Sequence, residues 1–296
     1  MEVLKIENLK KSFGDKEVLK GVDLTINSNS IYGFVGKNGA GKTTTMKMIL
    51  GLLKIDEGRI LVNGKEVAFG DNETNKYIGY LPDVPEFYGY MTAREYLKLC
   101  GEISGMSKND IKERCDELLL RVGLSNEKKK IKGYSRGMKQ RLGIAAALFS
   151  RPKLLICDEP TSALDPIGRK ELLSILLESK KETTIIFSTH ILSDVEKVCD
   201  EMAFLNDGKI VLSGKIADIK NKNRSNRVVI NSDGHNDELL SKFKILSKLS
   251  DEEVLLMDLN KLPEILKYMG DNNIIPLRIE RLEPSVEDLF VEVTGA

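Results

Sequence analysis

The run Gly36-Lys37-Asn38-Gly39-Ala40-Gly41-Lys42-Thr43 constrains this chain more than any other feature, because it fits the phosphate-binding pattern G-x-x-x-x-G-K-[ST]. Residues 31–35 before it are typical of a short buried strand, and residues 44–50 after it of the first turns of a helix. This order points backbone N–H groups and the positive end of a helix dipole at one place. The sequence therefore predicts a nucleotide site formed by Gly36, Asn38, Gly39, Ala40, Gly41, Lys42, Thr43 and Thr44.

Four side chains give this site its predicted chemistry. Lys42 can reach the β- and γ-phosphates of ATP, and the Thr43 hydroxyl can bind Mg²⁺. The apolar strand predicted at residues 153–157 is followed by two acids: Asp158 suits metal binding, and Glu159 suits the general base that activates water. Two acids after an apolar strand also fit a solvated loop, but together with the phosphate-binding loop (P-loop) they indicate an enzyme that hydrolyses a nucleotide.

Composition and charge exclude several other classes of protein. The chain has 45 basic and 45 acidic residues, so its formal net charge gives no support to nucleic-acid binding. Its four cysteines form no C-x-x-C pair and it has only two histidines, so we expect no zinc site and a reduced, cytoplasmic setting. We expect no signal peptide, and no apolar run is long enough to span a bilayer. If the protein acts at a membrane, another polypeptide must cross it.

The pattern of elements predicts two domains. Residues 1–215 form an α/β domain, in which the apolar strands 153–157 and 184–188 indicate a parallel core sheet. Within it, Asn63-Gly64 indicates a hairpin turn, and residues 92–123 are typical of helix, with Ser107 as a cap. Residues 216–226 are predicted to be a polar linker. Residues 227–296 form a small α+β domain with the ferredoxin-like order βαββαβ, whose strands and helices are expected at 227–231, 238–243, 245–249, 254–258, 262–269 and 274–279, followed by a helix at 285–293.

A second glycine-containing segment, Tyr134-Ser135-Arg136-Gly137-Met138, precedes a helix that runs to Phe149. Ser135 is a good N-cap, and Gly137 has no side chain to cover the N–H groups of the first helical turn. This helix end could therefore bind an anion. On helix chemistry alone, an ordinary cap is the favoured interpretation.

These motifs, in this order, resemble those of the nucleotide-binding subunits of ABC transporters over residues 1–215. Residues 36–43 look like the Walker A motif, residues 154–159 like Walker B, and residues 134–138 like the signature, which is usually Leu-Ser-Gly-Gly-Gln. Three further positions fit the same family: Asp165 in the D-loop, His190 as the switch histidine, and Phe13 as the aromatic residue that stacks on adenine. For Phe13, core packing is the alternative.

The resemblance implies a P-loop NTPase fold with a mixed sheet and a helical subdomain, and a site shared by two subunits. Each ATP would lie between the P-loop of one subunit and the signature of a second copy or a relative. Ser135 and Gly137 would contact the γ-phosphate across that interface, His190 would contact it from its own side, and Asp165 would link the two sites. The partner would be an integral membrane permease, with this subunit peripheral on the cytoplasmic face of the membrane.

The chain departs from the family pattern at three positions. Asp83 stands where the family often has Gln; a carboxylate can still contact Mg²⁺ or water, but it cannot donate a hydrogen bond when ionised. Arg136 and Met138 replace the usual Gly and Gln of the signature. Because the essential Ser and Gly remain, we expect activity. Nearby, Tyr88 and Tyr90 form an aromatic cluster where this family docks its permease, with buried packing as the near-equal alternative.

The first functional hypothesis is an ATPase subunit that powers export through a separate permease. The tail at residues 283–290 is similar to that of drug- and peptide-export subunits. The alternative is a soluble ABC ATPase acting on ribosomes or DNA, which the lack of a second such domain or a coiled-coil insertion disfavours. A regulatory nucleotide binder is a third hypothesis, and the intact Lys42, Asp158 and Glu159 argue against it.

Overall fold

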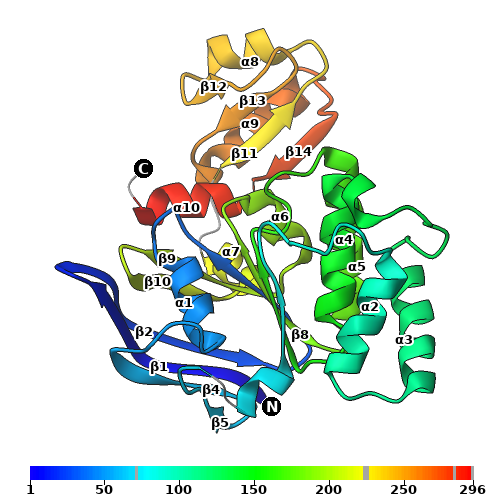
Figure 1. The fold of residues 1–296 in the computed structure, drawn as a ribbon. Coiled ribbons are helices and arrows are strands. Elements are labelled where there is room, and N and C mark those ends of the chain that lie inside the picture. Colours follow the sequence, from blue (N-terminus) through cyan, green and yellow to red (C-terminus); the bar gives the residue numbers. More distant parts are fainter. Residues whose placement is uncertain (71–72, 223–226, 283–284, 295–296) are drawn as a thin grey trace. The chain divides into compact units, whose positions relative to one another are not determined.

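The computed structural model describes residues 1–70, 73–222, 227–282 and 285–294. The chain divides into two compact units (Figure 1): residues 1–216 together with the end of the chain from Val293, and residues 217–292. Helix α7 (Ile216–Lys222) occupies the first part of the predicted linker, and linker residues 223–226 lie outside the described residues. Residues 283–284, the first two residues of the predicted export-type tail, also lie outside the described residues.

The first unit is built on a six-stranded sheet in the order β10-β9-β3-β8-β7-β6. Its strands are β3 (Ile31–Val35), β6 (Ile78–Leu81), β7 (Leu154–Asp158), β8 (Thr184–Thr189), β9 (Glu201–Asn206) and β10 (Lys209–Lys215). Five strands are parallel, which confirms the predicted core sheet, and β10 adds an antiparallel edge. Because β3 and β7 run in the same direction, the segments that follow them, the P-loop and Glu159, lie at the same edge of the sheet.

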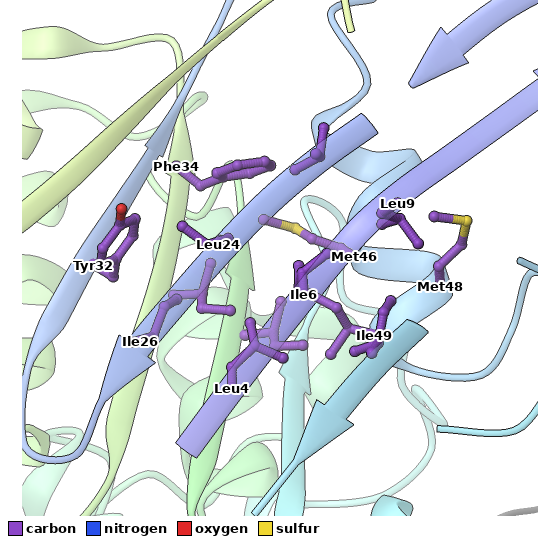
Figure 2. Packing of buried hydrophobic residues seen from close by; sticks show 14 of the residues in the cluster. Leu4, Ile6, Leu9, Leu24, Ile26, Tyr32, Phe34, Met46, Met48 and Ile49 are labelled. Atoms are coloured by element: carbon purple, nitrogen blue, oxygen red, sulfur yellow. The ribbon is translucent and has the colours of Figure 1, made fainter. Parts of the chain in front are cut away.

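A second, antiparallel sheet in the order β2-β1-β4-β5 packs on the first. Its strands are β1 (Glu2–Phe13), β2 (Lys16–Asn27), β4 (Glu57–Val62) and β5 (Lys65–Glu66). The predicted Asn63-Gly64 hairpin joins β4 to β5, with both turn residues at positive φ, 51° and 77°. Figure 2 shows Met46 and Met48, from the helix after the P-loop, buried among the side chains of the two sheets. This core fixes the helix that carries Lys42.

Helices complete the first unit: α1 (Lys42–Ile49), α2 (Ala93–Ile103), α3 (Lys108–Arg121), α4 (Arg136–Ala147), α5 (Pro166–Ser179) and α6 (Leu192–Val198), with the short 3₁₀ turns η1 (Glu73–Tyr77) and η2 (Ile131–Gly133). The helical segment predicted at 92–123 is two helices. Gly105, at φ +70°, follows the end of α2, and the Ser107 hydroxyl accepts a hydrogen bond from the Asp110 N–H at 3.2 Å at the start of α3.

The second unit has the element order βαββαβ: β11 (Val228–Asn231), α8 (Asn236–Lys242), β12 (Leu246–Lys248), β13 (Val254–Leu256), α9 (Leu262–Asp271) and β14 (Arg278–Arg281), with the 3₁₀ turn η3 (Leu259–Lys261) and a last helix α10 (Val286–Thr294). The antiparallel sheet has the order β12-β13-β11-β14. The ferredoxin-like assignment itself stays a prediction.

The last strand of the second unit starts later than the predicted 274–279. Ile274 is buried, and its N–H donates to the carbonyl of Met269 at the end of α9. Pro276 has no N–H to add to a sheet ladder. The ladder therefore begins only at Arg278.

Candidate nucleotide site

The P-loop connects β3 to α1, and its glycines are required by close packing. A Cβ on Gly36 would lie 2.5 Å from the carbonyl oxygen of Leu205. A Cβ on Gly41, which has φ +112°, would lie 2.6 Å from Leu19 Cδ2. Gly41 is also the N-cap of α1 and has no side chain to occupy the first N–H groups of the helix. These N–H groups can therefore bind an anion.

The Lys42 side chain is buried at the centre of this loop. Its Nζ donates to the carbonyl of Gly36 at 2.7 Å and lies 3.5 Å from Oε1 of Glu159. The ammonium group therefore lies between the loop backbone and the carboxylate that follows β7, the two segments that the sequence predicts on either side of a triphosphate.

Asp158 and Thr43 meet beside Lys42. The Thr43 hydroxyl donates to Oδ2 of Asp158 at 3.1 Å, while buried Oδ1 of Asp158 has no hydrogen-bond partner among the described residues. Burial raises the pKa of Asp158, because the carboxylate loses its water. Mg²⁺ in phosphoryl-transfer sites takes one or two protein oxygens and completes its shell with phosphate and water. A hydroxyl next to an unsatisfied carboxylate oxygen fits that ion.

Glu159 contacts His190, although the two are far apart in sequence. Glu159 Oε2 lies 2.8 Å from Nδ1 of His190, which follows β8. The backbone of Glu159 is held by a 2.9 Å hydrogen bond from its N–H to the carbonyl of Ser188, with φ at +48°. A residue with a side chain seldom adopts this conformation, and such strain concentrates at functional sites. Adjacent strands β7 and β8 thus bring the two predicted catalytic residues together.

Asp83 contacts helix α4 and the loop after β7 in the same unit. Its Oδ1 accepts a hydrogen bond from the Ser162 hydroxyl at 2.8 Å and lies 3.7 Å from Nη2 of Arg136. Its backbone carbonyl accepts a hydrogen bond from the Gln140 side chain. A role of Asp83 at Mg²⁺ stays a prediction. Asp83 and Arg136, two departures from the expected family pattern, are thus in contact, which their separation in the sequence did not predict.

The other predicted interface residues lie at two helix starts. Ser135 is the N-cap of α4, and its hydroxyl accepts a hydrogen bond from the Met138 N–H at 3.2 Å. An added Cβ on Gly137 would meet only Leu164 Cδ2, at 3.8 Å, so the first turn is open. Asp165 is the N-cap of α5, and its side chain accepts a hydrogen bond from the Gly168 N–H at 2.8 Å. The caps are observed; contacts across a dimer stay predictions.

Three predicted aromatic residues are exposed. Phe13 is 51% exposed at the end of β1, with Lys11 Nζ 5.4 Å from its ring centroid, so the core-packing alternative is wrong. Tyr88 and Tyr90 are 54% and 68% exposed, so buried packing is wrong for them too. Next to them in the sequence is a pocket of about 520 Å³ lined by Val84, Pro85, Glu86, Phe87, Gly89, Ile131, Lys132, Arg136 and Lys139.

Two buried hydroxyl groups near the acids were not anticipated. Ser188 is paired in register with Asp158, and Thr161 is the second residue after Glu159. Both hydroxyl oxygens are buried and lack a hydrogen-bond partner within the described ranges. For Ser188 the available signal was a hydroxyl residue directly after the apolar run Ile185–Phe187.

Comparison with known proteins places these motifs in a family. A family model described as "ABC transporter" matches residues 19–162. The chain is 38% identical over 300 residues to YxlF, an uncharacterised ABC transporter ATP-binding protein of Bacillus subtilis (strain 168), covering 99% of this chain and 100% of the relative. It is 36% identical over 312 residues to the bacitracin transport ATP-binding protein BcrA of Bacillus licheniformis, covering 99% and 97%. A solved ATP-binding subunit of an ABC transporter matches with a TM-score of 0.67 at 32% identity, covering 74% of this chain and 92% of that chain. Across the described residues, no helix is both long and apolar enough to cross a membrane.

Proposed function

The chain belongs to the ABC transporter family as one of its ATP-binding subunits, and on that premise we propose that it hydrolyses ATP to power export through a separate membrane permease. The observation that carries the proposal is the Glu159 carboxylate, which lies between Lys42 and His190 next to the Asp158–Thr43 pair. This cluster supplies a base, a phosphate-binding cation and metal-binding oxygens in one place.

Each side chain has a distinct role in this proposal. Glu159 accepts a proton from the attacking water, and His190 orients its carboxylate through the 2.8 Å contact. Lys42 binds the β- and γ-phosphate oxygens from its fixed position in the loop. When bound, Mg²⁺ is held by Thr43 and Asp158 and neutralises charge on the phosphate oxygens. Phe13 is available for adenine, because its ring is exposed and β1 pairs with β2, whose Leu19 packs against the P-loop.

A second subunit completes the site. Ser135 and Gly137 present an open helix start, whose free N–H groups suit the γ-phosphate bound to another copy. Asp165 connects the two sites from the start of α5. ATP thus holds two subunits together, and its hydrolysis removes that contact.

The pocket near Tyr88 and Tyr90 is the proposed permease contact. Three basic residues, Lys132, Arg136 and Lys139, line it against one acid, Glu86. We propose that an acidic, partly aromatic cytoplasmic segment of the permease binds there and that the subunit lies on the inner face of the membrane. Export is favoured by similarity to a protein named for bacitracin transport.

The test is a pull-down with tagged Glu159→Gln protein and ATP from detergent-solubilised cells of its source, with Lys42→Ala as the matched control. Recovery of a polytopic membrane protein supports the proposal and identifies the permease. Recovery of ribosomes or DNA without a membrane protein would instead favour the soluble ABC ATPase.

A further inference from the structure

The last strand of the second unit, β14, forms one edge of its sheet. All four of its residues, Arg278 to Arg281, are exposed. Two apolar residues just before it, Ile275 and Leu277, are 77% and 64% exposed. An exposed edge strand with apolar neighbours can pair with a strand of another molecule.

The hydrogen bonds of β14 show which backbone groups face outward. The Leu282 N–H donates to the carbonyl of Arg227 at 2.8 Å, next to the β11–β14 ladder. Alternate residues of an antiparallel strand bond to the same neighbour, so the backbones of Glu280 and Arg278 also face β11. The pattern is irregular just before β14, because the Leu277 N–H also donates a hydrogen bond to the carbonyl of Asn231. The N–H and carbonyl of Ile279 therefore face the outer edge.

We propose that β14 pairs antiparallel with β14 of a second copy of this chain, about a two-fold axis at Ile279. Ile279 then lies opposite Ile279 of the other copy and exchanges two backbone hydrogen bonds with it. In the same register, Arg278 of each copy lies opposite Glu280 of the other. The two sheets join into one, and the facing charges are complementary on both sides of the axis.

The charge pattern selects this register over its neighbours. Because only alternate residues of β14 have outward-facing backbone groups, the neighbouring registers are shifted by two residues. They would place Glu280 opposite Glu280, or Arg278 opposite Arg278, of the other copy, and like charges directly opposite each other destabilise a strand pair. Charged residues usually protect an edge strand from pairing; here Arg278 already binds Glu280 and Glu253 of its own chain, and the register centred on Ile279 adds two attractive contacts between the copies.

This contact needs no nucleotide, so it goes beyond the ATP-dependent pairing proposed above and can be tested apart from it. A pair of second units held together would keep two ATPase subunits at high effective concentration after ATP is hydrolysed. The subunits would then re-form the ATP-bound dimer without a new diffusional encounter.

Cysteine cross-linking of the full chain without nucleotide tests the register. Facing residues of a hydrogen-bonded antiparallel pair have Cα atoms about 5.5 Å apart, within disulfide range. Ile279→Cys should therefore form a covalent dimer under mild oxidation. Leu277→Cys is the matched control: it is more exposed, but the two copies of residue 277 would lie roughly 13 Å apart. Native thiols interfere little, since burial raises the pKa of Cys100 to about 11 and also raises the pKa values of Cys115, Cys157 and Cys199.

Charge exchange within the Ile279→Cys protein tests the pairing chemistry. Adding Glu280→Arg should lower the dimer yield at least about fivefold, because Arg278 then faces an arginine. Adding Arg278→Glu as well should restore the yield. Equal cross-linking at residues 277 and 279, no cross-linking at 279, or no recovery in the double exchange would overturn the proposal. Those results would not contradict the proposed ATP hydrolysis. Conversely, a finding that the protein does not hydrolyse ATP would not contradict the proposed strand pairing.

Discussion

Replacing Glu159 with glutamine separates ATP turnover from ATP binding. Glutamine keeps the shape of the side chain, and its amide oxygen can still accept a hydrogen bond from His190. It cannot take a proton from water. General-base catalysis contributes about 10²- to 10⁴-fold, or roughly 2.7–5.5 kcal/mol at 1.36 kcal/mol per tenfold, so turnover should fall by that factor.

Binding should change in the opposite direction. The Glu159 carboxylate lies 3.5 Å from Lys42 Nζ and is largely buried. Its negative charge therefore competes with the phosphates for that ammonium group. Removing the charge should leave ATP affinity unchanged or raise it, and the P-loop N–H groups remain in place.

Two assays read these effects. Phosphate release at saturating ATP gives turnover, and titration calorimetry gives affinity. The control is Glu66→Gln, the same chemical change at an exposed residue on β5. Parental turnover in Glu159→Gln would refute the general-base assignment, and ATP affinity reduced more than about tenfold would refute the electrostatic argument.

Three further changes have expected outcomes. Lys42→Ala should weaken ATP binding about 10- to 100-fold in calorimetry, because a hydrogen bond to a charged group is worth about 1.5–3 kcal/mol; unchanged affinity would contradict the P-loop assignment. Gly36→Ala should lower the free energy of unfolding by about 1–3 kcal/mol in a denaturant titration, because its Cβ would lie 2.5 Å from the Leu205 carbonyl oxygen; parental stability would count against that clash. Glu182→Gln should be less stable than the parent at pH 7, because the hydrogen bond from Arg121 holds the pKa of Glu182 below its ordinary value of 4.5; this stabilisation is present above pH 4.5 and is lost as the pH falls through the folded pKa, so a gap in melting temperature that did not close in acid would contradict it.

The sequence predicted those parts of the site that are local patterns at strand ends. The P-loop and Asp158 each follow from an apolar strand and the residues directly after it. The contact between Glu159 and His190 depends on β7 and β8 being neighbours in the sheet. Glu159 was predicted as the base for the attacking water and His190, from the family resemblance, as a contact of the γ-phosphate, but neither prediction implied a contact between the two side chains.

The sequence failed where one residue overrode a regional pattern. Residues 274–279 are apolar enough for a strand, yet Ile274 closes the end of α9 and Pro276 cannot join a ladder. Similarly, residues 92–123 have helical composition throughout, but Gly105 and Ser107 divide them into α2 and α3. A single glycine, serine or proline can thus end or delay an element that the composition of the whole segment predicts.

Asp83 and Arg136, two residues that depart from the expected family pattern, form an ion pair with each other. A cation at the first residue of a helix is disfavoured by the helix dipole, so an arginine in place of glycine at the start of α4 needs a compensating charge. The Asp83 carboxylate, 3.7 Å away, supplies it. The pair therefore provides a charged link between the loop after β6 and the start of α4.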